Sequence, residues 1–87
     1  MDPSTEVFEL SERVVISPSA GRVALPPAPV RAVEGEFVMR GDSVAAIRVG
    51  GREVPVRTEF RGWMMGFLVL DGQPTHRGDP IAWLRKA

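Results

Sequence analysis

The chain contains the same short pattern twice, and this duplication limits what it can fold into. Residues 33–48 read VEGEFVMRGDSVAAIR, and residues 70–85 read LDGQPTHRGDPIAWLR, 37 positions later. The segments SPSAGRV (17–23) and TEFRGWM (58–64) match in the same way at an offset of 41. Two copies are too few for a solenoid, in which each repeat buries its apolar face against neighbours. The duplication therefore predicts one closed domain with two quasi-equivalent halves.

The composition fits a single small globular domain. The chain has 87 residues and is 44% hydrophobic, which is enough for one modest core. It has no cysteine, and this excludes a disulfide framework, a thiolate metal site and a cysteine nucleophile. The longest apolar run, residues 63–70, is too short to span a bilayer, so no membrane association is expected. No apolar leader with a small-residue cleavage site opens the sequence, so we expect a cytoplasmic protein.

Short strands are expected throughout, because Gly and Pro recur at short intervals and no segment keeps a 3.6-residue period. The dipeptide Gly50-Gly51 lies between two alternating segments and predicts a two-residue hairpin. The fold class is therefore all-β, with roughly 7–8 short strands. The apolar, β-branched segments that predict strands are 13–17, 22–25, 30–33, 43–49, 53–57, 63–70 and 80–85.

The first twelve residues differ from the rest of the chain in charge. They carry Asp2, Glu6, Glu9 and Glu12 and no basic residue. We expect residues 1–12 to be an acidic tail or an edge strand, and residues 13–87 to form the folded domain.

Glycine turns recur at equivalent positions in the two copies. Gly41-Asp42 and Gly78-Asp79 each predict a turn, because Gly tolerates positive φ and Asp accepts hydrogen bonds from nearby backbone. Gly35 and Gly72 are also repeat-equivalent, and we assign them to turns as well. The tripeptide Arg-Gly-Asp thus occurs twice at matched places, which indicates turn chemistry and not an integrin ligand.

The order and spacing of these motifs resemble the biotinyl/lipoyl attachment domain family. SPSAGRV (17–23) followed by GDSV (41–44) fits the first half of the family pattern. GWM (62–64) followed by GDPI (78–81) fits the second half. The resemblance covers residues 13–86 and implies a barrel-sandwich hybrid with two quasi-symmetric halves. An OB-like or SH3-like barrel is the competing architecture, because it also uses short strands and Gly turns.

The resemblance also implies an acceptor lysine at the tip of the central hairpin, and this sequence departs from the family there. The equivalent stretch is Gly50-Gly51-Arg52, and the only lysine of the chain is Lys86, beside the C-terminus. A guanidinium keeps its proton (pKa above about 12) and offers no neutral amine for acylation. The sequence therefore predicts an atypical member that carries neither biotin nor lipoate, and no other cofactor.

The sequence shows no catalytic constellation. His76 is the only histidine and lies in a turn-rich segment, where we expect it to be exposed. A serine-histidine-carboxylate triad or a zinc site needs partners that no spacing indicates. The acidic pairs Glu34/Asp71 and Asp42/Asp79 are repeat-equivalent, so turn capping explains them better than acid–base chemistry. We expect no enzymatic activity and no metal site.

The apolar segment 63–70 predicts an interaction surface. A strand with a break in alternation at Gly66 places one set of side chains outward: Trp63, Met65, Leu68 and Leu70. It places another set inward: Met64, Phe67 and Val69. The first repeat has Arg22 and Arg31 at the positions that match Trp63 and Leu68, whereas Trp83 replaces Ala46 and extends the apolar set. A contiguous apolar patch on a small domain usually marks an interface; the alternative is that residues 1–12, with Phe8 and Leu10, cover it.

Three functions are compatible with the sequence. The first is a non-catalytic, unmodified domain that binds a protein partner or forms a homodimer through the strand at residues 63–70. The second is a carrier subunit of a carboxylase or a 2-oxoacid dehydrogenase complex. The third is a small nucleic-acid-binding barrel, which needs a basic face interleaved with aromatic residues. Few aromatic residues accompany the arginines here, so nucleic acid is the weakest of the expected partners.

Overall fold

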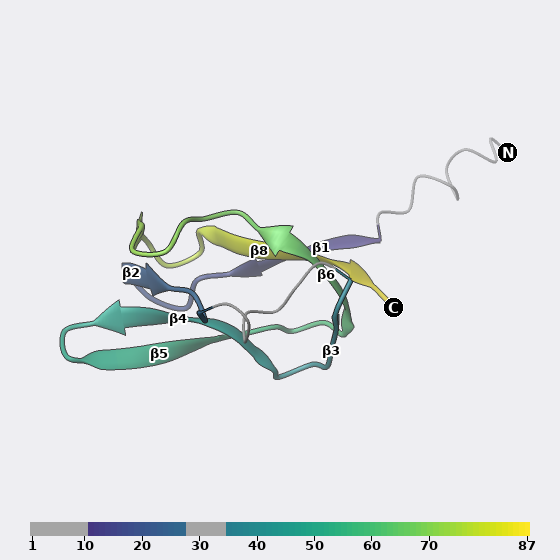
Figure 1. Cartoon of the computed structure of the whole chain (residues 1–87), viewed down its shortest axis with the longest axis horizontal. Helices are drawn as coiled ribbons and strands as arrows, with labels where there is room; N and C mark the ends of the chain where they lie inside the picture. The colour runs from purple at the N-terminus through teal and green to yellow at the C-terminus, as the bar shows by residue number, and fades with distance from the viewer. Residues whose placement is uncertain (1–10, 28–34) are drawn as a thin grey trace, which may run out of the picture.

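Two four-stranded antiparallel sheets form the protein in a computed structural model, which describes residues 11–27 and 35–87 (Figure 1). Sheet A has the strand order β1-β8-β6-β3, and sheet B has the order β5-β4-β2-β7. The fold is a barrel-sandwich hybrid without helices among the described residues, as predicted. The strands are β1 (Glu12–Ile16), β2 (Gly21–Ala24), β3 (Phe37–Val38), β4 (Ser43–Val49), β5 (Arg52–Arg57), β6 (Gly62–Phe67), β7 (Pro74–Thr75) and β8 (Pro80–Lys86).

The sequence duplication is also a structural duplication. An offset of 37 places β3 on β7 and β4 on β8, and an offset of 41 places β1 on β5 and β2 on β6. Replacing each strand of sheet A by its counterpart turns the order β1-β8-β6-β3 into β5-β4-β2-β7, which is sheet B. The two halves are therefore related by a pseudo-twofold axis, and every strand in one sheet has a counterpart in the other.

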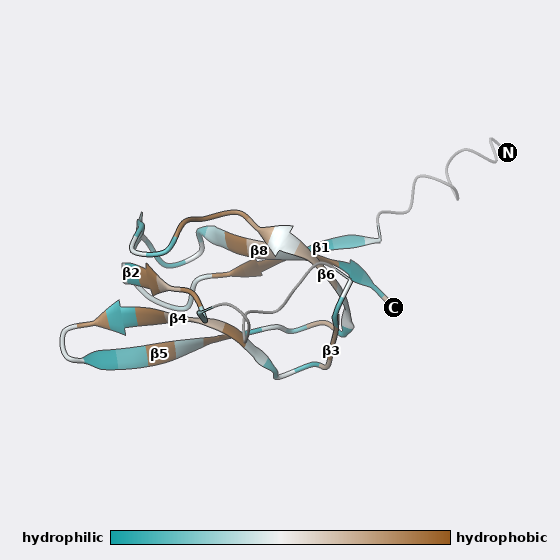
Figure 2. Ribbon diagram, in the orientation of Figure 1, coloured by the Kyte–Doolittle hydropathy of each residue, from teal (hydrophilic) through white to brown (hydrophobic). Residues whose placement is uncertain are grey.

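The core lies between the two sheets and draws on both repeats. Alternate residues of each strand point inward, so that β4 and β8 show the same order of buried and exposed positions over their first six residues. Strand β4 contributes Ile47 and β8 contributes the matched Leu84, both with no exposed surface. Figure 2 shows these hydrophobic stretches within the strands and hydrophilic residues toward the ends of β4 and β5. The buried cluster comprises Val15, Val23, Val38, Val44, Ala45, Ile47, Val56, Met64, Ile81, Ala82 and Leu84.

Gly21 and Gly62 are matched glycines that the close approach of neighbouring backbone requires. A Cβ atom on Gly21 would collide with the carbonyl oxygen of Arg48, and one on Gly62 would collide with that of Arg85. Arg48 and Arg85 are themselves repeat-equivalent. The glycine of the SPSAGRV and TEFRGWM segments is therefore a packing requirement of the two sheets.

Most predicted strands are confirmed, but the strand predicted at 63–70 ends at Phe67, and the other exceptions are short or lie outside the described residues. Strand β4 has the predicted bounds, and the two-residue hairpin between β4 and β5 is confirmed by the pairing of Val49 with Arg52. Strands β3 and β7 were not predicted, because two residues are too few to show alternation. The predicted strand at 30–33 and residues 1–10 lie outside the described residues. Strand β1 begins at Glu12, the last residue of the segment expected to be a tail.

Candidate functional site

The tip of the β4–β5 hairpin lies where the family resemblance places an acceptor lysine. Gly50 has φ of 61°, and no heavy atom would contact a Cβ at Gly51, so the turn stands clear of the domain. Arg52 follows it as an exposed first residue of β5. Lys86 lies at the end of β8, at the opposite end of the molecule from the hairpin tip (Figure 1). The tip therefore presents a guanidinium and no primary amine.

The two Gly-Asp turns are built in the same way. Gly41 and Gly78 have φ of 91° and 90°. The Asp42 carboxylate accepts a 2.8 Å hydrogen bond from the backbone N–H of Met39, and Asp79 accepts one of the same length from His76. These carboxylates cap turns, as predicted, and lie in separate places. Gly35 and Gly72 also have matched positive φ values, 86° and 81°.

His76 is exposed, as expected for a turn residue. Its Nδ1 atom lies 3.7 Å from the Asp79 carboxylate, and its side chain is 85% exposed. Within residues 11–27 and 35–87, no group of three or more His, Asp or Glu side chains is placed to hold a metal ion. No helix in that part of the chain is long and apolar enough to cross a membrane.

The outer face of sheet A carries an aromatic pair on β6 and on its edge strand β3. Strand pairing aligns four exposed residues in one row across the sheet: Glu12, Arg85, Trp63 and Phe37. Trp63 is 42% exposed and Phe37 is 43% exposed, and their rings meet edge to face with centroids 5.2 Å apart. Such pairs stabilise each other beyond simple burial. This row, which we call the aromatic row, was only partly predicted, because Phe37 lies in the short β3.

A second row of sheet A continues the apolar surface. Val14, Trp83 and Gly66 are aligned on β1, β8 and β6. A bulge between Met64 and Gly66 interrupts the β6–β8 pairing, and the Trp83 indole nitrogen lies 3.5 Å from where a Gly66 Cβ would be. The prediction that Trp83 extends the apolar set agrees with this placement.

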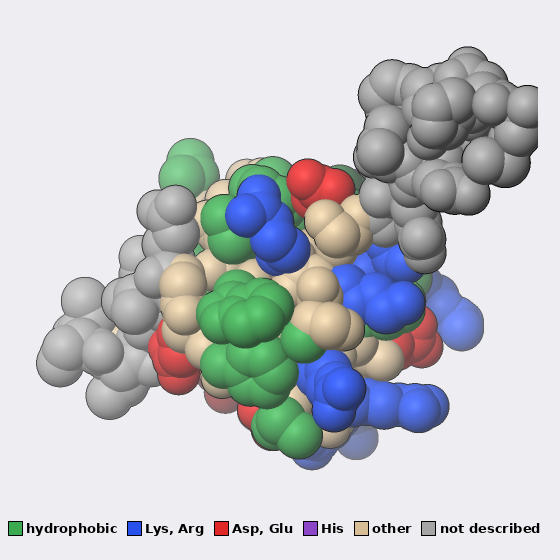
Figure 3. Space-filling view, turned by 90° about the vertical axis from the view of Figure 1, so that its right-hand side faces the viewer, with side chains coloured by type: hydrophobic (Ala, Val, Ile, Leu, Met, Phe, Trp, Pro, Cys, Tyr) green, Lys and Arg blue, Asp and Glu red, His purple; other side chains and the backbone are tan. Residues whose placement is uncertain are grey.

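The residues predicted to point outward from the segment 63–70 are mostly exposed. Trp63, Leu68 and Leu70 are exposed, whereas Met65, at the bulge, is half-buried. Met64 is 1% exposed, and Phe67 and Val69 pack against the core, as predicted. Leu68 and Leu70 follow the end of β6, and the Leu68 backbone N–H donates to Ile81 on β8. Figure 3 shows hydrophobic side chains gathered on the end of the molecule that faces the viewer, bordered by Lys and Arg.

The outer face of sheet B has the same backbone and different chemistry. Its row matched to the aromatic row is Glu53, Arg48, Arg22 and Pro74. Arg48 Nε lies 3.3 Å from the Glu53 carboxylate, and Arg22 donates a hydrogen bond to the Gly72 carbonyl. Where sheet A places Trp63 beside Phe37, sheet B places Arg22 beside Pro74. We call this the charged row.

Comparisons with known proteins identify the fold. No family model matches the chain, and no curated protein matches it. Solved structures do match, among them that of a single-chain, multi-domain long-chain acyl-CoA carboxylase, with a TM-score of 0.71 and 19% sequence identity. That match covers 88% of this chain and 7% of the carboxylase chain, so the protein corresponds in size to a small part of it. At this identity the likeness shows the fold alone.

Proposed function

We propose that the protein is an unmodified biotinyl/lipoyl-like domain that recognises proteins through the outer face of sheet A, above all a second copy of itself. The observation that carries this proposal is the contrast between the aromatic row and the charged row. The two rows occupy matched positions on matched strands, so the fold does not require aromatic residues at Trp63 and Phe37. An exposed aromatic pair that the fold does not need is typical of a recognition surface.

The hairpin tip supports an unmodified state. Acylation by biotin or lipoate needs a neutral amine, and Gly50-Gly51-Arg52 offers only backbone and a guanidinium. Lys86 does not replace the missing group, because it lies in β8 at the other end of the domain. A carrier function would therefore have no attachment point at its usual place.

The order of residues in the aromatic row favours a second copy. In the dimer that we propose, the twofold axis lies in the plane of the interface, perpendicular to the row and midway between Arg85 and Trp63, so that the rows of the two copies run antiparallel. The row order Glu12, Arg85, Trp63, Phe37 then places Arg85 of each copy over Trp63 of the other. A guanidinium over an indole is a favourable cation–π arrangement, and it forms twice in such a dimer.

The exposed apolar side chains support association. Burial of one large apolar side chain stabilises by roughly 1.5–3 kcal/mol, before the entropic cost of association is subtracted. The outer face of sheet A and the loop after β6 expose six such side chains: Val14, Ile16, Phe37, Trp63, Leu68 and Leu70. The free energy gained by burying several of these side chains together exceeds the lower end of the range for the entropic cost of association.

Sedimentation velocity of the wild type and the Trp63→Arg variant tests this function. Trp63→Arg introduces the residue that Arg22 already supplies at the matched position, so the fold should accept it. We expect a concentration-dependent dimer for the wild type and a monomer for Trp63→Arg. The Arg22→Ala variant, on the charged row, should associate like the wild type. A wild type that stays monomeric at high concentration contradicts self-association.

Intact-mass spectrometry after co-expression with a biotin ligase or a lipoate ligase tests the unmodified state. We expect the mass of the unmodified chain in both cases. A mass increase mapped to the hairpin would instead support the carrier function. The Arg52→Lys variant places an amine at the tip, and its acylation would show that the remaining recognition surface is intact.

A further inference from the structure

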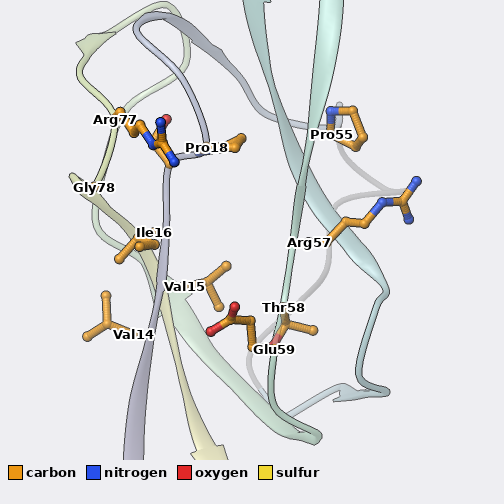
Figure 4. A pocket seen from close by; sticks show the side chains of 11 residues that line it. Val14, Val15, Ile16, Pro18, Pro55, Arg57, Thr58, Glu59, Arg77 and Gly78 are labelled. Carbon is orange, nitrogen blue, oxygen red and sulfur yellow. The ribbon is translucent and has the colours of Figure 1, made fainter.

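A groove lies between β1 and β5, the edge strands of the two sheets. Its volume is about 480 Å³, and its walls come from β1, β5, the loops that follow them and the Arg77-Gly78 turn. Figure 4 shows Val15 directed from β1 toward β5, with Pro18 also between the two strands. Val15 is only 3% exposed, so it forms an apolar floor. The volume is in the range of pockets that bind small ligands.

The β1 edge of the groove has backbone groups that the sheet does not use. Antiparallel neighbours exchange hydrogen bonds only at alternate residues. The N–H of Lys86 donates to the Ser11 carbonyl, and β1 pairs with β8 in continuous register from Glu12 to Val15. The odd-numbered residues of this stretch therefore bond to β8. The N–H and C=O of Val14 face away from β8, toward the groove.

The matched edge of β5 is blocked by a proline. Val49 and Arg52 close the two-residue hairpin, so the even-numbered residues of β5 bond to β4, and Pro55 faces the groove. Proline has no N–H and is tolerated in a strand only at such an edge. An offset of 41 makes Pro55 the counterpart of Val14. One wall of the groove thus has an available donor at a position where the other wall has none.

Opposite charges stand at the two ends of the groove. The Arg77-Gly78 turn is tied to the end of β1 by a 2.8 Å hydrogen bond from Gly78 N–H to the Ser17 carbonyl. Glu59 lies toward the other end, near Val15, in Figure 4. Among residues 11–27 and 35–87, neither the Arg77 nor the Glu59 side chain makes an ion pair or a hydrogen bond. Arg57 lines the groove too, but it donates to the Gly41 carbonyl and points away from β1 in Figure 4.

We propose that this groove binds an extended peptide of another protein, which adds a strand to the free edge of β1. The peptide backbone pairs with the N–H and C=O of Val14, and an apolar side chain lies on Val15 and Pro18. A carboxylate of the peptide meets Arg77, and a basic group meets Glu59. Strand addition of this kind takes its affinity from main-chain hydrogen bonds and its specificity from side-chain pockets. The site does not include the aromatic row and does not rest on the proposed self-association, although Val14 and Ile16 border both surfaces.

The probe is the peptide acetyl-Lys-Val-Thr-Val-Glu-amide, labelled for fluorescence polarisation with the full chain. Its β-branched residues favour an extended backbone, and it carries a basic Lys at one end and an acidic Glu at the other. We expect saturable binding below about 1 mM, the weak end of specific affinities. Val14→Pro removes the free donor, and the fold already holds proline at the matched Pro55. This variant should weaken binding by about tenfold, the effect of one lost hydrogen bond together with the unpaired peptide carbonyl.

Charge variants give a second, independent measurement. Arg77→Glu lies in an exposed turn and should weaken binding by about tenfold or more, because it replaces an attraction by a repulsion. Arg40→Glu is the matched control: it makes the same change at the repeat-equivalent position, which does not line the groove, and should bind like the wild type. In NMR titrations, amide shifts should concentrate at Val14–Ser17 and Arg77-Gly78.

Three results would overturn the proposal. The first is no binding of the peptide at about 1 mM. The second is wild-type affinity in both Val14→Pro and Arg77→Glu. The third is a set of shifts confined to Phe37 and Trp63, which would place the peptide on the aromatic row and leave the proposed self-association to be judged by sedimentation alone.

Discussion

The outer faces of sheet A and sheet B show what the fold needs and what it leaves free. At positions that pack the core or neighbouring backbone, the two sheets agree in kind: Ile47 matches Leu84, and Gly21 matches Gly62. At outward-facing positions they differ: the exposed Trp63 stands where the matched strand has Arg22, and the half-buried Trp83 stands where it has Ala46. Shared residues therefore report the requirements of packing, whereas unshared exposed residues are available for recognition. Substitutions at shared and at unshared positions test this distinction.

The largest effect is expected where a matched glycine touches backbone. Gly62→Val should destabilise the domain by about 3 kcal/mol or more, because its side chain would overlap the Arg85 carbonyl, which cannot move without breaking the sheet. Gly21→Val should cost a similar amount against Arg48. Gly51→Ala, where the new Cβ contacts nothing, is the control and should melt near the wild-type temperature. Unequal losses at Gly21 and Gly62, measured by chemical denaturation, would break the equivalence of the two halves.

A smaller loss of stability, similar in the two halves, is expected at the Gly-Asp turns. Gly41→Val and Gly78→Val each force a β-branched residue into positive φ, which costs on the order of 1–3 kcal/mol. No neighbouring atom adds a steric penalty at either site, so the losses should be smaller than at Gly62. Thermal melting should show similar shifts for the two variants. Wild-type stability in both would argue against the left-handed conformation of these turns.

Much of the fold was predictable because the same turn and strand residues occur twice in the sequence. Residues 33–48 and 70–85 share six identical and four similar pairs; the Gly-Asp pairs among them mark turns, and turns define where the strands begin and end. The contact that makes Gly21 and Gly62 necessary was not predictable, because it depends on how closely β2 and β6 approach their neighbours. The position of the hairpin tip and its lack of a lysine could be read directly from the sequence Gly50-Gly51-Arg52.

The candidate interface was less predictable than the fold. Alternation correctly separated Met64 from Trp63, but the bulge at Met65 shifted the register beyond it. Phe37 was missed because β3 has only two residues, and its significance depends on pairing with Trp63 across the sheet. The groove between β1 and β5 joins residues from three distant segments, so no local pattern indicates it.

Leu68→Arg tests whether the apolar surface serves association and not folding. Leu68 is 48% exposed, and Arg31 occupies its position in the first repeat, so unfolding stability should change by less than about 0.5 kcal/mol. Self-association should weaken, because a charge replaces an apolar contact. Sedimentation velocity and thermal melting measure the two effects separately. A variant that fails to fold would show instead that Leu68 is covered within the chain, as the alternative with residues 1–12 requires.

The smallest effect concerns the acidic ends of the two rows, Glu53 and Glu12. Glu53 lies 3.3 Å from Arg48, and both side chains are more than half exposed, so solvent and salt screen their attraction. Glu53→Gln should therefore cost at most about 0.5 kcal/mol at low salt and less at high salt. Glu12 is paired with Arg85 in register, but the two side chains form no ion pair, so Glu12→Gln should leave stability unchanged. Denaturant titration measures the stability of both variants. If Glu12→Gln lost as much stability as Glu53→Gln, and the loss also depended on salt, Glu12 would interact with Arg85 as strongly as Glu53 interacts with Arg48.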